Sequence, residues 1–193
     1  MKKMLTPLLA LAMMGCVTME DDDHRLAGPP SPDNTALSLD IGGLRLVTVT
    51  NGSTRPIEFG IAAAHAKTAV ALAMGERGRE ARSEDCDGVY GGVLLQTSWH
   101  DNGLDIFADP ESGRFVGWNL SRAGLSTMNG VSVGTTRADL ERAYSVDLVE
   151  DSTLEHEFWI SANGDEGLGG VFDGPGRNAR VATLWSGTVC QHR

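Results

Sequence analysis

Two stretches of the chain repeat the same order of hydrophobic and polar positions. The first begins at residues 57–60 (IEFG) and continues into the Ala-rich segment 61–75; the second begins at residues 131–134 (VSVG) and continues into segment 135–148. In each stretch, alternating apolar residues predict a short strand that ends at a glycine, and a helix is expected to follow it. This order of strand, glycine and helix, found twice, is the first sign of an internal repeat.

The second of these helices carries its own start signal. Thr136 and Asp139 fit the Thr-x-x-Asp capping box, so the helix is expected to begin there. Arg137 and Glu141 are four residues apart on the outer face and can form an ion pair. The first helix is expected to end at Gly75. An apolar stripe is expected at corresponding positions of the two helices: Ala66, Ala69 and Val70, then Leu140, Ala143 and Tyr144.

After each helix the chain is typical of antiparallel strands joined by tight turns. The turn-forming segments are 109–113 (DPESG) and 173–178 (DGPGRN). The strands before and after these turns also echo each other: Ile106-Phe107 matches Val171-Phe172, and Arg114-Phe115 matches Arg180-Val181 with one residue inserted. Alternation predicts that one strand buries a single face, formed by Val116, Trp118 and Leu120.

The repeat divides the body of the chain into residues 35–125 and 126–193. Its predicted fold class is α+β: an antiparallel sheet with short helices packed on it, made of two related repeats. The pattern of residues 133–143 (VGTTRADLERA) resembles the glycine-led helix signature of the small lipoproteins of the outer-membrane assembly machinery. It also resembles the tandem-repeat β-lactamase inhibitor protein. The resemblance implies helices on an antiparallel sheet and binding rather than catalysis, and it carries over no individual binding residue.

The chain begins with a predicted export signal. Lys2 and Lys3 precede an apolar run over residues 4–14, which is shorter than the roughly 20 residues of a membrane-spanning helix. This pattern is typical of a secretory signal peptide. The run ends at Gly15-Cys16, which resembles a bacterial lipoprotein signal. In that family residues 1–15 would be removed and Cys16 would be diacylated. Ordinary cleavage after residues 10–12 (ALA) is the alternative, and it would give a secreted protein without lipid.

The residues after Cys16 predict a tether and a location. Residues 16–34 are acidic and Pro-rich, which suits a solvated linker between a lipid anchor and a folded body. Val17 in place of Asp resembles lipoproteins that are sorted to the outer membrane. We therefore expect the protein in the cell envelope, held at the outer membrane and facing the periplasm.

Composition removes some classes of function and leaves a pair of cysteines. The formal net charge is −10 and no Lys/Arg-rich block occurs, so a nucleic-acid partner is not expected. Neither a P-loop nor a dinucleotide fingerprint is present, and no cofactor is predicted. With Cys16 assigned to lipid, Cys86 and Cys190 are left for a disulfide in an oxidising compartment. The alternative of free thiols or a metal site lacks any CxxC or Cys-His spacing.

The strongest enzyme-like pattern surrounds Ser132. Residues 130–134 fit G-x-S-x-G, and His156 and His192 follow in the order that a hydrolase would need. However, the valines on either side of Ser132 indicate an ordinary alternating strand instead of a strained nucleophile turn. Its counterpart in the first repeat is Glu58, so the position is not reserved for a nucleophile.

No metal site is predicted either. Glu155 and Glu157 flank His156 on an expected strand, which would place the two carboxylates on the opposite face from the imidazole and leave them as surface charge. The predicted function is therefore non-enzymatic: a lipid-anchored envelope protein that binds another envelope protein or serves envelope integrity. Exposed aromatic residues on the sheet are the expected contact surface. The alternatives are a small periplasmic hydrolase that uses Ser132 and an inhibitor of a foreign hydrolase.

Overall fold

The computed structural model describes residues 34–84, 86, 92–162 and 166–190. The predicted signal peptide, Cys16 and the tether up to residue 33 lie outside the described residues. The described part is α+β, as predicted. Its elements are β1 (Thr35–Asp40), β2 (Gly43–Thr48), β3 (Thr54–Glu58), α1 (Ala63–Met74), β4 (Arg79–Glu84), β5 (Val93–Trp99), β6 (Leu104–Ala108), β7 (Phe115–Leu120), α2 (Arg137–Ala143), β8 (Asp147–Leu148), β9 (Glu157–Ser161), β10 (Gly167–Phe172) and β11 (Val181–Gly187).

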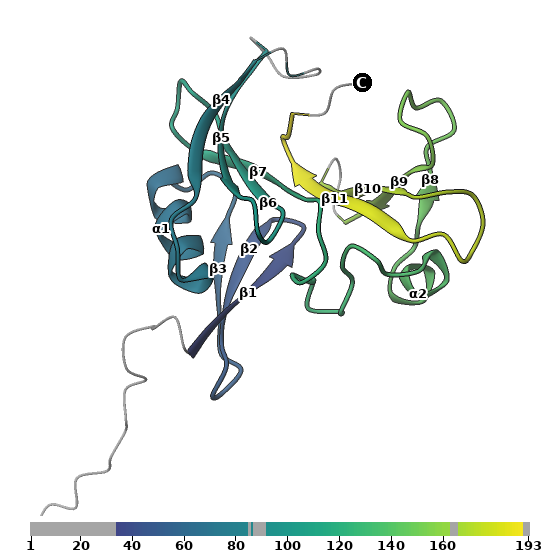
Figure 1. Cartoon of the computed structure of the whole chain (residues 1–193), viewed down its shortest axis with the longest axis horizontal. Helices are drawn as coiled ribbons and strands as arrows, with labels where there is room; N and C mark the ends of the chain where they lie inside the picture. The colour runs from purple at the N-terminus through teal and green to yellow at the C-terminus, as the bar shows by residue number, and fades with distance from the viewer. Residues whose placement is uncertain (1–33, 85, 87–91, 163–165, 191–193) are drawn as a thin grey trace, which may run out of the picture.

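The strands form two antiparallel sheets (Figure 1). A three-stranded sheet has the order β1-β2-β3, and an eight-stranded sheet has the order β4-β5-β6-β7-β11-β10-β9-β8. Helix α1 is followed by β4 to β7, and helix α2 is followed by β8 to β11. The last strands of these two runs, β7 and β11, pair in the middle of the sheet. The strands that follow the two helices therefore share one sheet, whereas β1–β3 of the first predicted repeat form the other.

Each half begins with the same backbone turn. Gly60 has φ 88° and donates its N–H to the carbonyl of Phe115 at 2.7 Å; Gly134 has φ 90° and donates to the carbonyl of Val181 at 2.8 Å. Two arginines donate from their guanidinium groups to the carbonyls of these same glycines, namely Arg114 and Arg180. The backbone frame is thus equivalent in the two halves, and its origin in a duplication stays a prediction.

The pairing of the strands sets a correspondence between β6 and β10 that differs by one residue from the correspondence predicted from the sequence. The register shifts between Phe107 and Ala108 in β6, and between Val171 and Phe172 in β10. Phe107 therefore corresponds to Val171, and Ala108 corresponds to Phe172. The predicted match of Ile106-Phe107 with Val171-Phe172 is wrong, because β-bulges, which a comparison of residue types does not detect, fix the register.

The bulge also overturns one predicted face. Trp118 and Leu120 lie in the main core, as predicted, but Val116 packs with a second cluster of buried residues. Strand β6 pairs with Phe115 and with Gly117 and skips Val116. The extra residue turns Val116 to the opposite face, so the period of two does not hold there.

The main core lies between one face of the eight-stranded sheet, the two helices and the three-stranded sheet. The helices contribute Ala66, Val70 and Leu140, all fully buried, whereas Ala143 of the predicted stripe is exposed. The opposite face of the sheet carries the smaller cluster, formed by Cys86, Leu94, Phe107, Trp185 and Val189. Residues 131–133, predicted as a strand, lie outside any strand.

Several local predictions are confirmed. The Thr136 hydroxyl accepts the backbone N–H of Asp139 at 3.1 Å at the start of α2. Arg137 and Glu141 form their ion pair at 2.7 Å. Helix α1 ends at Gly75, which has a left-handed φ of 71°. These features depend on residues within one or two turns of each other, which is why the sequence displays them.

Candidate binding surface

A disulfide secures the face of the eight-stranded sheet that the helices leave open. Cys86 and Cys190 are bonded, with their Cα atoms 4.6 Å apart, as the cysteine count predicts. The chain end runs back over the sheet, where the Thr188 N–H donates to the carbonyl of Val116 at 2.8 Å. The bridge therefore joins the chain beyond β4 to the C-terminal segment and covers one part of this face.

The same face carries a continuous row of residues across all eight strands, and one of them, Trp185, also belongs to the smaller buried cluster. Residues that pair directly in neighbouring strands point to the same face. The row is Arg79, Ser98, Asp105, Asn119, Trp185, Gly169, Trp159 and Asp147. In the central strands the neighbours of these residues pack in the main core on the other face, for example Ile106, Trp118 and Leu184. We call this row, together with Thr183, the open face.

Two tryptophans lie flat on the open face because glycines leave room for them. A Cβ atom on Gly167 would come 2.3 Å from Cζ2 of Trp159, and one on Gly169 would come 2.4 Å from Nε1 of Trp185. Any larger residue at these glycines would collide with an indole ring. The sequence shows the glycines, but only the strand register shows which ring each one accommodates.

The indole N–H groups of the open face differ from those of the core. Trp99 and Trp118 donate from Nε1 to backbone carbonyls at 3.1 and 2.9 Å. Neither Trp159 nor Trp185 makes such a bond to another described residue. Trp185 is only 3% exposed and packs in the smaller buried cluster with Cys86, whereas Trp159 is half-buried. The indole N–H of Trp159 is therefore the one of these two donors that a partner could reach.

Polar groups occupy the neighbouring strands of the row: Asn119 pairs directly with Trp185, and Asp105 lies one strand further on. Asp105 is half-buried, and its carboxylate forms no hydrogen bond or ion pair with another residue in the described ranges. The side-chain oxygen of Asn119 accepts from the hydroxyl of Thr183 at 3.0 Å. Of the four tryptophans, Trp99, Trp118 and Trp185 are buried, and Trp159 is half-buried. The expected exposed aromatic surface is therefore limited to Trp159, with polar groups elsewhere in the row.

Ser132 does not lie in a nucleophile turn. Its hydroxyl donates to the carbonyl of Leu125, and its backbone N–H donates to the hydroxyl of Thr135 at 3.0 Å. Among the described residues, a positive φ outside glycine occurs only at His156. No side-chain base of the described ranges hydrogen-bonds to Ser132, and His192 lies outside them. The hydroxyl holds a loop in place.

The prediction that Glu157 is surface charge is wrong. Glu157 is only 3% exposed, and its carboxylate accepts a hydrogen bond from the hydroxyl of Ser152. His156 has a left-handed φ of 60°, and strand β9 begins only after it. This conformation breaks the alternation on which the prediction depended. In the part of the chain that the structure describes, no three His, Cys, Asp or Glu residues could hold a metal ion.

Each helix also borders a hollow at the rim of the sheet. Beside α1 and β4 it has a volume of about 360 Å³ and includes Lys67, Arg77 and Trp99 in its lining. Beside α2 and β8 it has a volume of about 260 Å³ and includes Leu148 and Phe172. The first hollow extends past the end of α1 to Arg77, whereas the second lies at the start of α2, at Arg137, so the two hollows differ in both place and side chains.

Comparisons with known proteins give little further information. No protein-family model matches the chain, and no curated protein matches it. A solved structure, that of the uncharacterized protein yfeY from Escherichia coli, is similar with a TM-score of 0.42 and 18% sequence identity; the match covers 63% of this chain and 87% of that one.

None of the helices in the described ranges has the length and apolar character needed to cross a membrane.

Proposed function

We propose that the protein is a lipid-anchored component of the bacterial cell envelope that binds another envelope protein through the open face. Cys16 would carry the lipid at the outer membrane, and residues 17–34 would hold the body away from the bilayer on the periplasmic side. The proposal requires no cofactor and no catalytic step by this chain.

The observation that carries the proposal is the composition of the open face. A sheet face that served only to stabilise the fold would bury its indole N–H groups against partners, as Trp99 and Trp118 do. On the open face, the N–H of the half-buried Trp159 makes no hydrogen bond to another described residue, and the half-buried carboxylate of Asp105 has no hydrogen bond or ion pair within the described ranges. Tryptophan is enriched among the residues that dominate protein–protein binding energy, and free donors and acceptors suit recognition of another protein's backbone.

The export signal and the disulfide support the location. A disulfide between Cys86 and Cys190 is stable in the periplasm and rare in the cytosol. The chain is acidic, with a net charge of −10, so attraction to anionic lipids would not hold it at a membrane, and a lipid anchor would. A Cys16→Ser variant is expected to leave the membrane fraction. If it stays there, the anchor is not a lipid on Cys16.

Site-specific photo-crosslinking in living cells tests the binding surface. A photoreactive residue at Asp105, on the open face, is expected to capture one dominant envelope protein, which mass spectrometry identifies. The matched control places the same residue at the exposed Arg55 on β3 and is expected to capture no such protein. Trp159→Ala is expected to weaken binding at least about tenfold, the equivalent of roughly 1.4 kcal/mol. Equal capture from Arg55, or none from Asp105, contradicts the proposal.

The hydrolase alternative is separated from binding by Ser132→Ala. The variant loses the bond to the Leu125 carbonyl but is expected to retain both its cellular phenotype and its crosslinked partner. Loss of the phenotype in a folded variant that still binds the partner would favour the hydrolase.

A further inference from the structure

The two edges of the eight-stranded sheet differ in how the adjacent helix is fixed to the edge strand. In the first half, Lys67 of α1 reaches Glu80 of the edge strand β4 at 2.7 Å, so an ion pair fastens the helix to the edge. The position in the second half that corresponds to Glu80 is Leu148, and the position that corresponds to Lys67 is Glu141. Glu141 instead forms ion pairs with Arg137 of α2 at 2.7 Å and with Arg177 of the β10–β11 turn at 3.2 Å. No ion pair between described residues fastens α2 to β8.

The unfastened rim exposes apolar side chains. Leu148 is 45% exposed and the adjacent Val149 is 38% exposed. Both line the hollow of about 260 Å³ beside α2, together with Phe172. Strand β8 is the last strand on this side of the sheet, so its outer backbone groups face away from every described strand. Natural proteins protect sheet edges with charged side chains or by keeping the edge strand very short; β8 has only two residues, but the side chains of Leu148 and Val149 at this edge are apolar and exposed.

The other edge of the same sheet shows such protection. Strand β4 has the sequence REARSE, in which basic and acidic residues alternate along an exposed strand. Charged residues on an edge strand discourage pairing with another chain. Within one sheet, therefore, one edge carries charged residues along its length and the other carries exposed apolar side chains.

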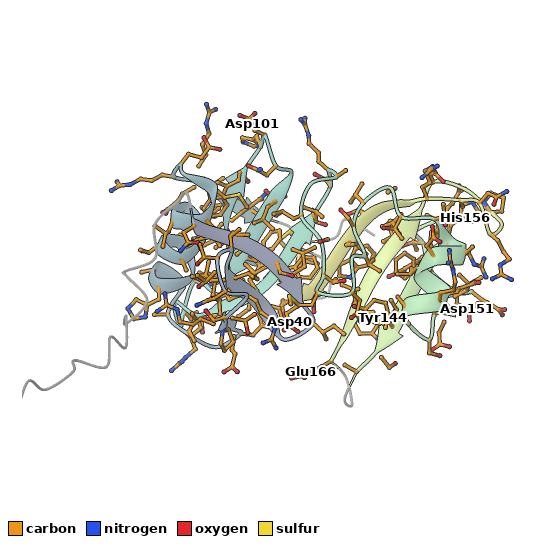
Figure 2. All side chains as sticks on the ribbon, turned by 90° about the horizontal axis from the view of Figure 1, so that it is seen from below. Asp40, Asp101, Tyr144, Asp151, His156 and Glu166 are labelled. Atoms are coloured by element: carbon orange, nitrogen blue, oxygen red, sulfur yellow. A yellow bond between two sulfur atoms is a disulfide. The ribbon has the colours of Figure 1, made fainter. Side chains whose placement is uncertain are left out.

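The charges around β8 define the chemistry of that partner. Four exposed acidic residues surround Leu148 and Val149, and none forms an ion pair with a described residue: Asp147, Glu150, Asp151 and Glu155. Of the nearby arginines, Arg137, Arg142 and Arg177 are paired with acids of α2, and Arg180 donates to the carbonyl of Gly134. Figure 2 shows Asp151 and His156 together at the end of the molecule that α2 and β8 form.

We propose that the β8 edge binds an extended, basic segment of a partner protein. Its backbone would pair with β8, an apolar side chain would lie over Leu148 and Val149, and its lysines or arginines would face the surrounding carboxylates. A second copy of this chain does not fit, because pairing of two β8 edges would bring the same acidic residues together. The chain's own segment 17–34 is acidic and is excluded for the same reason. The inference does not depend on the open face.

The test uses the full chain in detergent and a blocked synthetic peptide of alternating lysine and valine, followed by NMR amide shifts. We expect saturable shifts at residues 147–150, 156–157 and 172–176. A peptide of alternating glutamate and valine is expected to cause none. Shifts confined to the β4 edge, equal binding of the acidic peptide, or no binding of the basic one would overturn the proposal.

Matched variants separate local contacts from net charge. Glu150→Lys with Asp151→Lys is expected to weaken binding of the basic peptide at least tenfold. Glu76→Lys with Glu111→Lys makes the same change of charge at exposed sites elsewhere and is expected to weaken it less than twofold. If both double variants lose the same binding affinity for the basic peptide, the attraction is a long-range effect of net charge, and the proposed site at β8 is wrong.

The apolar contact and self-association are tested separately. Leu148→Lys is expected to abolish the peptide-induced shifts, whereas Val49→Lys, at a residue 63% exposed on another part of the surface, leaves them unchanged. Because both residues are exposed, both variants are expected to fold. A dimer in sedimentation that Leu148→Lys disrupts would show that a second copy occupies the edge, and would overturn the proposal.

Discussion

In the first half of the eight-stranded sheet, a helix of 12 residues lies beside an edge strand of 6 residues. In the second half, a helix of 7 residues lies beside an edge strand of 2 residues. The turns at Gly60 and Gly134 nevertheless make the same backbone hydrogen bonds in both halves. Backbone bonding therefore sets the common frame, whereas the side chains at the rim set the length of the helices and whether the edge is closed.

The two helices are also stabilised in different ways. Helix α1 has no side-chain cap at Ala62, and its many alanines supply intrinsic helix propensity. Helix α2 is too short to depend on propensity; the Thr136 cap and the Arg137–Glu141 ion pair hold it. A sequence can thus preserve a helix position while it replaces the interactions that support it.

The largest expected effect is the loss of stability when a core tryptophan is replaced, compared with the loss for a tryptophan on the open face. Trp118→Ala removes a fully buried ring and its hydrogen bond to the Asp40 carbonyl, and is expected to lower the free energy of unfolding by about 3–5 kcal/mol. Trp159→Ala, at a half-buried site, is expected to lower it by less than about 2 kcal/mol. Urea denaturation measures both. Equal losses would mean that the open face is part of the structural core.

The second prediction concerns the disulfide and the buried cluster around it. Cys86→Ala with Cys190→Ala opens a link between positions 104 residues apart and is expected to cost about 2–4 kcal/mol of stability. Because Trp185 belongs to the same buried cluster, its fluorescence is expected to shift to the red, while amide exchange in α2 stays unchanged. An unchanged denaturation midpoint would contradict the stabilising role.

The equivalence of the two turns predicts equal costs. Gly60→Ala and Gly134→Ala would each add a Cβ that meets no atom within 4 Å, so the whole cost comes from the left-handed φ and is expected to be about 1–2 kcal/mol. Gly42→Ala is the control, since its Cβ is equally free and its φ is not left-handed. Thermal unfolding of the three variants measures the difference. Clearly unequal costs at Gly60 and Gly134 would break the equivalence.

The helix caps give opposite effects in the two halves. Thr136→Ala removes the bond to the Asp139 N–H and is expected to cost about 1 kcal/mol. Ala62→Ser adds a cap that α1 lacks and is expected to gain about 0.5 kcal/mol. Denaturation midpoints measure both changes, and a loss of stability on Ala62→Ser would show that the start of α1 has no room for a cap.

The smallest expected effect concerns the turn between β6 and β7. The hydroxyl and the backbone N–H of Ser112 donate to the Asp109 carboxylate at 2.6 and 2.7 Å, which holds the pKa of Asp109 below its usual value. A lowered pKa gives stability that is present above the unfolded pKa of about 3.9 and is lost as the pH falls through the folded value. Ser112→Ala is expected to raise this pKa in an NMR titration. An unchanged pKa would contradict the assignment of its cause.

Local signals in the sequence were sufficient for several features of the fold. The Thr136 cap, the end of α1 at Gly75 and the turn segments 109–113 and 173–178 depend on neighbours along the chain, and all are present. The pairing of Cys86 with Cys190 followed from their number and the expected compartment. The antiparallel α+β class followed from the order of these signals. Cys16 and its lipid stay a prediction.

Other features were decided only by the tertiary structure. The bulge that turns Val116 away from the main core, the burial of Glu157 and the separation of β1–β3 into their own sheet depend on which strands meet and in which register. The same holds for Trp159 and Trp185, whose rings lie over glycines of a neighbouring strand. Period and residue type describe a strand by itself, but register and bulges are properties of a pair of strands. The sequence therefore determined the elements, and contacts between distant segments determined the faces they present.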